Sequence, residues 1–106
     1  GKFQGIQYKF ADMSAEIRAM ELLAYDTAAM KAAGVRHTLE AAQAKLFAAT
    51  RCTQICLECQ QILGGNGYSR EYHVERLVRD AKLFEIGEGT NEILRMLIGG
   101  TVLAKK

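Results

Sequence analysis

Glu88 stands between two glycines, in the run Gly87-Glu88-Gly89, directly before an expected helix start. A carboxylate on a mobile turn can act as a general base and remove a proton from a substrate. A carboxylate near the start of a helix is also a common surface charge that the helix dipole stabilises. The residue types alone favour this second interpretation, so Glu88 is a candidate base only if further evidence supports a substrate there.

A second glycine-rich segment is the run QILGGNGY at residues 61–68. Glycine has no Cβ, so its backbone can approach a ligand closely, and its N–H groups can bind phosphate. A helix C-terminus followed by a tight turn would need about two of the glycines in this run. The segment is not the dinucleotide-binding fingerprint of α/β proteins, because no strand precedes it.

Cys52, Cys56 and Cys59 have the spacing C-x3-C-x2-C, which is also the iron–sulfur signature of radical SAM enzymes. In this chain they fall on one apolar stripe of an expected helix, where free cysteine packs as a small hydrophobic side chain. We therefore expect core packing for the cysteines and no metal. His37 and His73 have no second ligand at metal-binding spacing. Solvated positions on a loop or helix are expected for both.

Charge, apolar content and cysteine count together exclude several classes of protein. The 106 residues include 14 Lys or Arg and 12 Asp or Glu, for a formal net charge of +2. This balance lacks the clustered basic excess that nucleic-acid binding requires. No apolar run approaches the roughly 20 residues that span a bilayer. An odd number of cysteines, 3, without a signal-peptide pattern favours reduced thiols in an intracellular protein.

The elements that must position these residues are predicted to be helices. Proline is absent and alanine is abundant, as is typical of an all-α chain. Apolar residues at spacings of three and four predict a first helix over about residues 4–33, which Gly34 would end in a left-handed conformation. Thr38 is expected to be the N-cap of a second helix that continues to the glycines at 64–67.

Two further helices are expected beyond the glycine-rich segment. Ser69 is the expected cap of a short third helix over about residues 70–84, and Thr90 is the expected N-cap of a last helix over about residues 91–103. Three long helices and a short one predict an all-α, up-and-down helical bundle. Loops carry function more often than cores do, so a ligand is expected at the two glycine turns.

Segments along nearly the whole chain resemble the C-terminal helical domain of the acyl-CoA dehydrogenases. They are FQGIQ at 3–7, ADM at 11–13, AKLFA at 44–48, QILGGNGY at 61–68, VERLVRDAK at 74–82 and EIGEGTNEI at 85–93. Members of that family have an N-terminal helical domain, a β-domain and a C-terminal helical bundle. The resemblance implies that residues 1–106 are a fragment of such an enzyme, with the first bundle helix missing.

The resemblance implies the α,β-dehydrogenation of an acyl-CoA thioester to the trans-2-enoyl-CoA, with FAD as the cofactor. Glu88 matches the glutamate base that removes the α-proton in medium- and short-chain members. In the family, the backbone N–H of that base residue and a ribityl hydroxyl of FAD hydrogen-bond the thioester carbonyl. These donors act as an oxyanion hole, because they stabilise charge that develops on the carbonyl oxygen.

The resemblance also implies which residues contact FAD and substrate. Residues 61–65 match a stretch that contacts the adenosine and pyrophosphate part of an FAD held mainly by a neighbouring subunit, and Gln4 matches another contact to FAD. Gly87 matches a residue of the acyl cavity, and Gly89 matches one at the thioester site. Residues 90–92 match positions beside the FAD of their own subunit. The expected FAD-binding residues are Gln4, Gln61, Ile62, Leu63, Gly64, Gly65, Thr90, Asn91 and Glu92.

Two positions depart from the family pattern. Gly87 stands where medium- and short-chain members have a tyrosine, so the acyl pocket is expected to be wider or to have a different floor. A glycine there is more like the isovaleryl branch, which places its base on an upstream helix and lacks the glutamate in this turn. His73 stands where a proline is frequent, which puts only the conformation of the local turn in question.

Two alternatives remain open. An acyl-CoA oxidase has the same scaffold but lets oxygen reoxidise the flavin, and a non-catalytic helical module would use the fold only for oligomerisation. Such a module would have no need of a carboxylate at Glu88. For a dehydrogenase, the expected partners are an acyl-CoA substrate, an electron-transfer flavoprotein and copies of itself in a homotetramer or homodimer. The expected location is the cytoplasm of a bacterium or the mitochondrial matrix of a eukaryote.

Overall fold

The computed structural model describes residues 2–104, which form helices joined by short turns and contain no strand. The elements are α1 (Gln4–Ala32), α2 (Thr38–Ile62), α3 (Gly65–Tyr68), the 3-10 helix η1 (Arg70–Tyr72), α4 (Val74–Ile86) and α5 (Asn91–Ala104). The predicted all-α bundle is confirmed. No helix in this described part of the chain is both long enough and apolar enough to cross a membrane.

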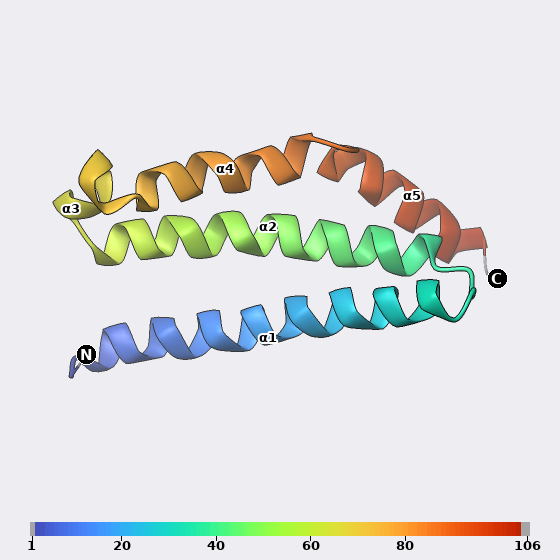
Figure 1. Ribbon diagram of the computed structural model, residues 1–106, viewed down its shortest axis with the longest axis horizontal. Helices are drawn as coiled ribbons and strands as arrows, with labels where there is room; N and C mark the ends of the chain where they lie inside the picture. The colour runs from blue at the N-terminus through green and yellow to red at the C-terminus, as the bar shows by residue number, and fades with distance from the viewer. Residues whose placement is uncertain (1, 105–106) are drawn as a thin grey trace.

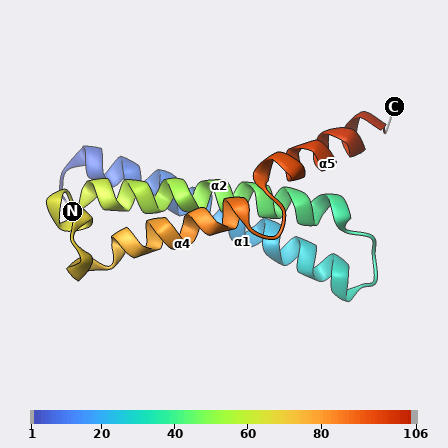
Figure 2. The same ribbon diagram turned by 90° about the horizontal axis from the view of Figure 1, so that it is seen from above.

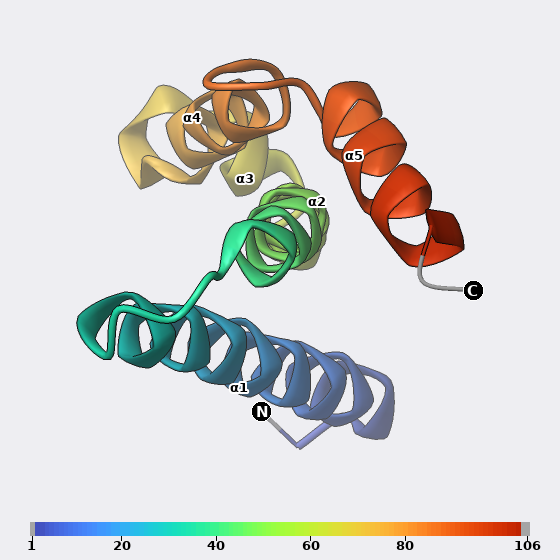
Figure 3. The same cartoon turned by 90° about the vertical axis from the view of Figure 1, so that its right-hand side faces the viewer.

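The central element is α2. Figure 1 shows α1 along one side of α2, with α4 and α5 end to end along the other side. The view along the long axis in Figure 3 places α2 between these two layers. α1, α2 and α4 alternate in direction, and α5 leaves the axis of α4 at the turn between them (Figure 2). One helix, α2, therefore contacts both sides of the turn that carries Glu88.

Small side chains make most of the buried contacts between the helices. The buried apolar residues are Met13, Ala42, Ala44, Ala49, Val74, Ala81 and Leu94. The apolar stripe predicted for α1 is only partly covered, because Phe10 and Ile17 are 55% and 44% exposed. Many other large apolar side chains are also exposed, among them Met96 and Leu103 of α5. Soluble monomers rarely expose so much apolar surface.

Several predicted helix ends are confirmed and one was wrong by a residue. Gly34 follows α1 with a φ of +70°, and Thr90 caps α5 because its Oγ1 accepts a hydrogen bond from Ile93 N at 3.3 Å. Thr38 is not an N-cap. It is the first residue of α2, and the N-cap is His37, whose carbonyl accepts from Ala41 N at 2.9 Å.

The third helix was predicted as one piece, but the structure divides it. Ser69 acts as a cap, as predicted, since its side chain accepts a hydrogen bond from Glu71 N, but it caps only η1. His73 then has a left-handed φ of +58°, and α4 begins at Val74. A proline could not adopt this conformation, because its ring holds φ near −65°. The local turn therefore differs from one that contains proline.

Candidate active site

The predicted site residues lie in two clusters at opposite ends of α4. The first, around Gly64 and Gly65, follows α2, and the second connects α4 to α5 at residues 87–92. α4 has 13 residues, which corresponds to about 20 Å at the helical rise per residue. Figure 1 shows the N-terminus of α1 at the same end of the molecule as the first cluster, so Gln4 lies at that end. One small ligand could not contact both clusters.

An open groove of about 710 Å³ lies beside the first cluster. Its lining residues are Leu57, Glu58, Gln60, Gln61, Gly64, Gly65 and Tyr68. Tyr68 is 86% exposed, so its ring forms a free wall of this groove. The amide Nε2 of Gln60 donates to the Gly67 carbonyl at 3.1 Å, which ties the glycine turn to the end of α2.

The glycines of this turn differ in why they are needed. Gly64 has a φ of +59°, and a Cβ added to Gly67 would lie 2.2 Å from the Gln60 carbonyl oxygen. The turn itself therefore requires glycine at both positions. Gly65 has no such constraint, because a Cβ there would meet no atom within 4 Å among the described residues. A glycine at position 65 keeps the groove open without being required by the fold.

The second cluster contains a strained turn at Glu88. Glu88 has a φ of +55°, and Gly89 follows it with a φ of +98°. A left-handed conformation costs a residue with a Cβ roughly 1–2 kcal/mol. The Glu88 side chain is exposed. Strain of this kind persists only when the surrounding structure holds the residue in place, and it is typical of functional sites.

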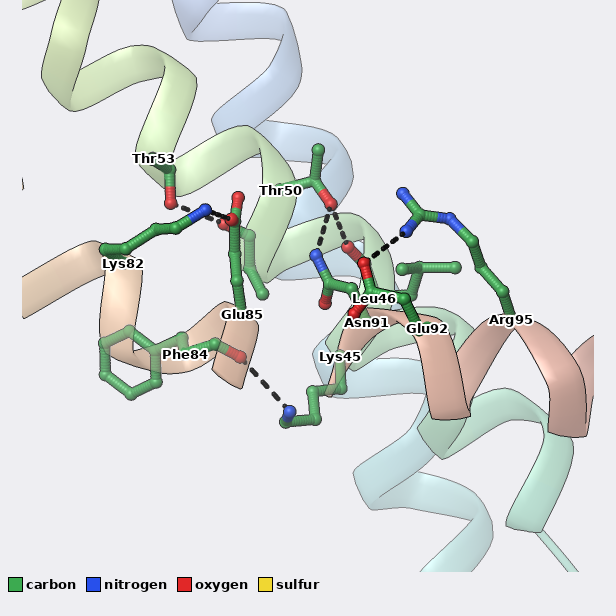
Figure 4. Close-up of polar contacts among 11 residues, drawn as sticks. Lys45, Leu46, Thr50, Thr53, Lys82, Phe84, Glu85, Asn91, Glu92 and Arg95 are labelled. Carbon is green, nitrogen blue, oxygen red and sulfur yellow. Dashed lines mark hydrogen bonds and ion pairs between the residues drawn. The ribbon is translucent and has the colours of Figure 1, made fainter. Parts of the chain in front are cut away.

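Lys45 of α2 holds this turn. Its ammonium donates hydrogen bonds to the carbonyl oxygens of Phe84 at 3.1 Å, Gly87 at 2.8 Å and Gly89 at 2.6 Å. Figure 4 shows the side chain reaching from α2 to the end of α4. α4 has no basic residue in its last turn. Lys45 therefore supplies the positive charge that the carbonyl groups at a helix C-terminus favour.

Sequence reasoning did not find Lys45 as a site residue. The available signal was its place in an alanine-rich stretch of the second helix. In the structure the neighbouring Ala42, Ala44 and Ala49 are all buried. A lysine among small buried residues must extend its side chain along apolar surface to a polar partner. The sequence did not reveal which partner that would be, because the carbonyl groups concerned lie about forty residues further along the chain.

Other side chains of α2 hold the residues on both sides of the turn. Thr50 Oγ1 accepts a hydrogen bond from Asn91 Nδ2 at 3.2 Å (Figure 4). Asn91 is 5% exposed, and its Oδ1 has no hydrogen-bond partner among residues 2–104. On the other side, hydrogen bonds from Lys82 and Thr53 hold the pKa of the Glu85 carboxyl below its ordinary value. The turn is thus fastened to α2 before, within and after Glu88.

The remaining predicted contacts of this cluster lie in different environments. Thr90 is half-buried and its hydroxyl is occupied by the cap of α5. Glu92 is exposed and lies 3.7 Å from Arg95, one turn further along the helix. The side chain of Asn91 contacts α2. Of the predicted set 90–92, Glu92 is therefore the residue whose side chain extends into solvent.

The cysteines are half-buried free thiols on α2. Cys59 Sγ lies 3.9 Å from Met13 Sδ, at the contact between α1 and α2. Burial, with a further contribution from Cys52, raises the pKa of the Cys56 thiol to about 11. A raised pKa keeps the thiol protonated and unreactive. The predicted packing role therefore agrees with the environment of these side chains.

Comparison with known proteins gives consistent matches. The family model described as "Acyl-CoA dehydrogenase, C-terminal domain" matches residues 1–103. The chain is 50% identical over 101 residues to the probable acyl-CoA dehydrogenase YngJ of Bacillus subtilis. This alignment covers 95% of this chain and 27% of that protein. It is 42% identical over 103 residues to CarC of Acetobacterium woodii, a subunit of the caffeyl-CoA reductase–Etf complex, with coverage of 97% and 27%.

A solved structure agrees with these sequence matches. The chain superposes on butyryl-CoA dehydrogenase from Megasphaera elsdenii with a TM-score of 0.94 and 46% identity. The superposition covers 96% of this chain and 27% of that one. The chain thus spans about a quarter of the length of the relatives that it matches.

Proposed function

This chain belongs to the acyl-CoA dehydrogenase family, and we propose that residues 1–106 are the C-terminal domain of an FAD-dependent enzyme that converts an acyl-CoA to the trans-2-enoyl-CoA. The turn at Glu88 is the observation that carries the proposal. It presents an exposed carboxylate in a strained conformation that three hydrogen bonds from Lys45 maintain. A positive φ alone does not indicate a function, because His73 has a similar φ of +58°. The exposed carboxylate on a turn that Lys45 holds is what supports a role as a base.

In the proposed reaction the Glu88 carboxylate removes the α-proton of the thioester. The α-C–H bond is weakly acidic until the thioester carbonyl is polarised, and a hydrogen bond from the Glu88 backbone N–H would supply that polarisation. No backbone carbonyl within residues 2–104 accepts a hydrogen bond from this N–H. A bound FAD would supply the acceptor for the hydride that leaves the β-carbon. The proton remains on the Glu88 carboxyl group, and the product has a double bond between its α- and β-carbons.

The residues present fit an extended dinucleotide cofactor. Gly65 leaves the groove floor free of a Cβ, and Asn91 has a buried Oδ1 without a partner. We propose that Gln4 and residues 61–65 hold the adenosine and pyrophosphate part of a neighbouring subunit's FAD. Residues 90–92 would then contact the FAD of their own subunit. The length of α4, which separates the two clusters, supports their contact with two different cofactor molecules.

The proposed enzyme acts on an acyl-CoA, with Gly87 and Gly89 beside Glu88 at the substrate. We propose a homotetramer or homodimer, which the exposed apolar side chains of α1 and α5 support. An electron-transfer flavoprotein is the proposed electron acceptor. The similarity to CarC, which is a subunit of a complex with Etf, supports this choice of acceptor.

The test uses the full-length flavoprotein and its Glu88→Gln variant under anaerobic conditions. Butyryl-CoA and longer acyl-CoAs are mixed with each protein, and the loss of flavin absorbance is followed. The variant should retain FAD, and its rate should fall by a factor of about 10²–10⁴ or more, because a positioned base is lost. Glu71→Gln, which changes an exposed glutamate of η1, is the control and should react at the wild-type rate.

The possible outcomes distinguish an error in the identity of the base from an error in the proposed reaction. Fast loss of flavin absorbance in Glu88→Gln would show that the base lies elsewhere in the enzyme. A wild-type protein whose flavin no acyl-CoA reduces would refute the proposed function.

A further inference from the structure

Lys45 fixes the orientation of the peptide plane between Gly87 and Glu88. The Gly87 carbonyl accepts a hydrogen bond from Lys45 Nζ at 2.8 Å, and the described residues contain no cis peptide bond. In a planar trans peptide the C=O and the N–H point in opposite directions. Because the Gly87 carbonyl points to a side chain of α2, the Glu88 N–H points away from α2.

Lys45 also donates to the carbonyl that this N–H would use in a longer helix. If α4 continued, the Glu88 N–H would donate to the Phe84 carbonyl four residues earlier. Gly87 instead has an extended ψ of 152°, which ends the helix, and the Phe84 carbonyl accepts from Lys45 at 3.1 Å. The N–H is therefore left without a backbone partner while its direction is set. Such a group is available to an oxygen atom of a ligand.

The Lys45 side chain is itself well positioned for this role. It borders a hollow of about 320 Å³. The other residues that line this hollow are Met20, Ala48, Ala49, Cys52 and Phe84. A lysine places its methylene groups along such apolar surface and its ammonium at the polar edge. The three carbonyl oxygens use all three ammonium donors. Because one of them belongs to Gly89, Lys45 is hydrogen-bonded to the chain on both sides of Glu88.

We propose that Lys45 is a positioning residue, which holds the peptide between Gly87 and Glu88 so that the Glu88 N–H donates to the thioester carbonyl oxygen of the acyl-CoA. This inference rests on the function proposed above. Lys45 acts through the peptide and does not itself contact the substrate. Loss of Lys45 should weaken polarisation of the carbonyl, so it should slow proton removal more than it weakens substrate binding.

The test uses the full-length flavoprotein with Lys45→Met, which keeps a side chain of nearly the same length and removes all three donors. The first readout is the rate of loss of flavin absorbance at saturating butyryl-CoA, with its KM. The second is the infrared carbonyl stretch of bound [1-¹³C]butyryl-CoA. It is recorded after dithionite has reduced the flavin, so that the thioester stays intact. This stretch reports directly on hydrogen bonding to the carbonyl oxygen.

We expect Lys45→Met to lower the rate about 10- to 100-fold, which is less than the cost of deleting an oxyanion-hole donor outright. KM should stay within about threefold, because the interaction is strongest in the transition state. The carbonyl stretch should move toward its value in free butyryl-CoA. Lys45→Arg keeps the charge and the N–H donors, so it should restore most of the rate and of the spectral shift.

Arg79→Met is the matched control, because it removes a cation of α4 that pairs with Glu75 and contacts none of the three carbonyls. It should change neither readout. If Lys45→Met fails to retain FAD, Lys45→Gln replaces it. The glutamine side chain is shorter and has two donors. The carbonyl stretch of butyryl-CoA bound to this variant should therefore lie between its values in the wild type and in free butyryl-CoA.

The outcomes distinguish the positioning role of Lys45 from the proposed function. An unshifted carbonyl stretch in the Lys45 variant, with a reactive wild type, would overturn the positioning role and leave the proposed function intact. Equal losses in Arg79→Met would also overturn it, because they would show a general loosening of α4. A wild type that butyryl-CoA and longer acyl-CoAs do not reduce would refute the proposed function and this inference together.

Discussion

His73 and Glu88 hold the same left-handed backbone conformation at the two ends of α4, with φ values of +58° and +55°. No other residue with a Cβ has a positive φ within residues 2–104. His73 directs the chain into α4, and Glu88 directs it out toward α5. Since both residues carry the steric cost of this conformation, relief of the strain can be compared at a proposed catalytic position and at a structural one.

Glu88→Gly should make the full-length protein more stable and inactive at the same time. Glycine adopts a positive φ without a steric penalty, so the variant should gain up to about 1 kcal/mol. Without the carboxylate, acyl-CoA should no longer reduce the flavin. Thermal unfolding and flavin absorbance measure the two effects.

His73→Gly is the control for that experiment. It should give a similar gain in stability, because the φ is similar, and it should leave the rate of flavin reduction unchanged. A loss of stability in both glycine variants would contradict the strain inferred for these turns.

Gly67→Ala and Gly65→Ala should have opposite consequences. At Gly67 the new Cβ would lie 2.2 Å from a backbone oxygen, so we expect a loss of about 1–3 kcal/mol from overpacking. At Gly65 there is no clash, so stability should stay within about 0.5 kcal/mol of wild type. The Gly65 variant should lose FAD on gel filtration, because its Cβ stands in the groove. Wild-type flavin content in Gly65→Ala would argue against the groove as a cofactor site.

Alkylation of Cys56 should depend on pH in the way its environment dictates. The pKa of about 11, against an ordinary 9.0, implies about 100-fold less thiolate below pH 9 than in an ordinary cysteine. Iodoacetamide should therefore modify Cys56 far more slowly in the native protein than in urea, as peptide mass spectrometry can measure.

The same shift affects the stability of the protein at alkaline pH. The folded state favours the neutral thiol, so its contribution is complete below pH 9.0 and is lost as the pH rises toward 11. Equal alkylation rates in the native and unfolded protein at pH 8 would contradict the burial of this thiol.

Thr50→Val should leave both polar atoms of the Asn91 side chain without a partner inside the domain. Asn91 is 5% exposed and its Oδ1 is already unpaired, so the expected cost is about 1–3 kcal/mol. The double variant Thr50→Val, Asn91→Leu should recover most of this loss, because an apolar pair leaves no buried polar group unsatisfied. Unfolding experiments on the full-length protein measure both changes.

The single variants Asn91→Leu and Thr50→Val test the proposed contact between Asn91 and FAD. If Asn91 binds the cofactor, Asn91→Leu should lower the flavin content, whereas Thr50→Val should change it much less. Full flavin content in both variants would leave Asn91 with a structural role alone.

The helices and most of their ends were predictable because their signals are local. Gly34 and Thr90 act within a few residues of their own positions, one through its φ and the other through a hydrogen bond to Ile93. The third helix was predicted less well. The histidine at position 73 put the conformation of the local turn in question, but a histidine does not by itself specify a left-handed φ, so the break between η1 and α4 was not foreseen.

By itself, the sequence determined the helical class, the family and the two glycine-bounded places where chemistry was expected. The tertiary structure alone decided what holds those places. It separates Gly65, which the turn does not require, from Gly64 and Gly67, which it does. It also brings Lys45 to carbonyl groups about forty residues away. Periodicity and capping act over one or two helical turns, whereas a hydrogen bond between α2 and the end of α4 depends on how the two helices pack.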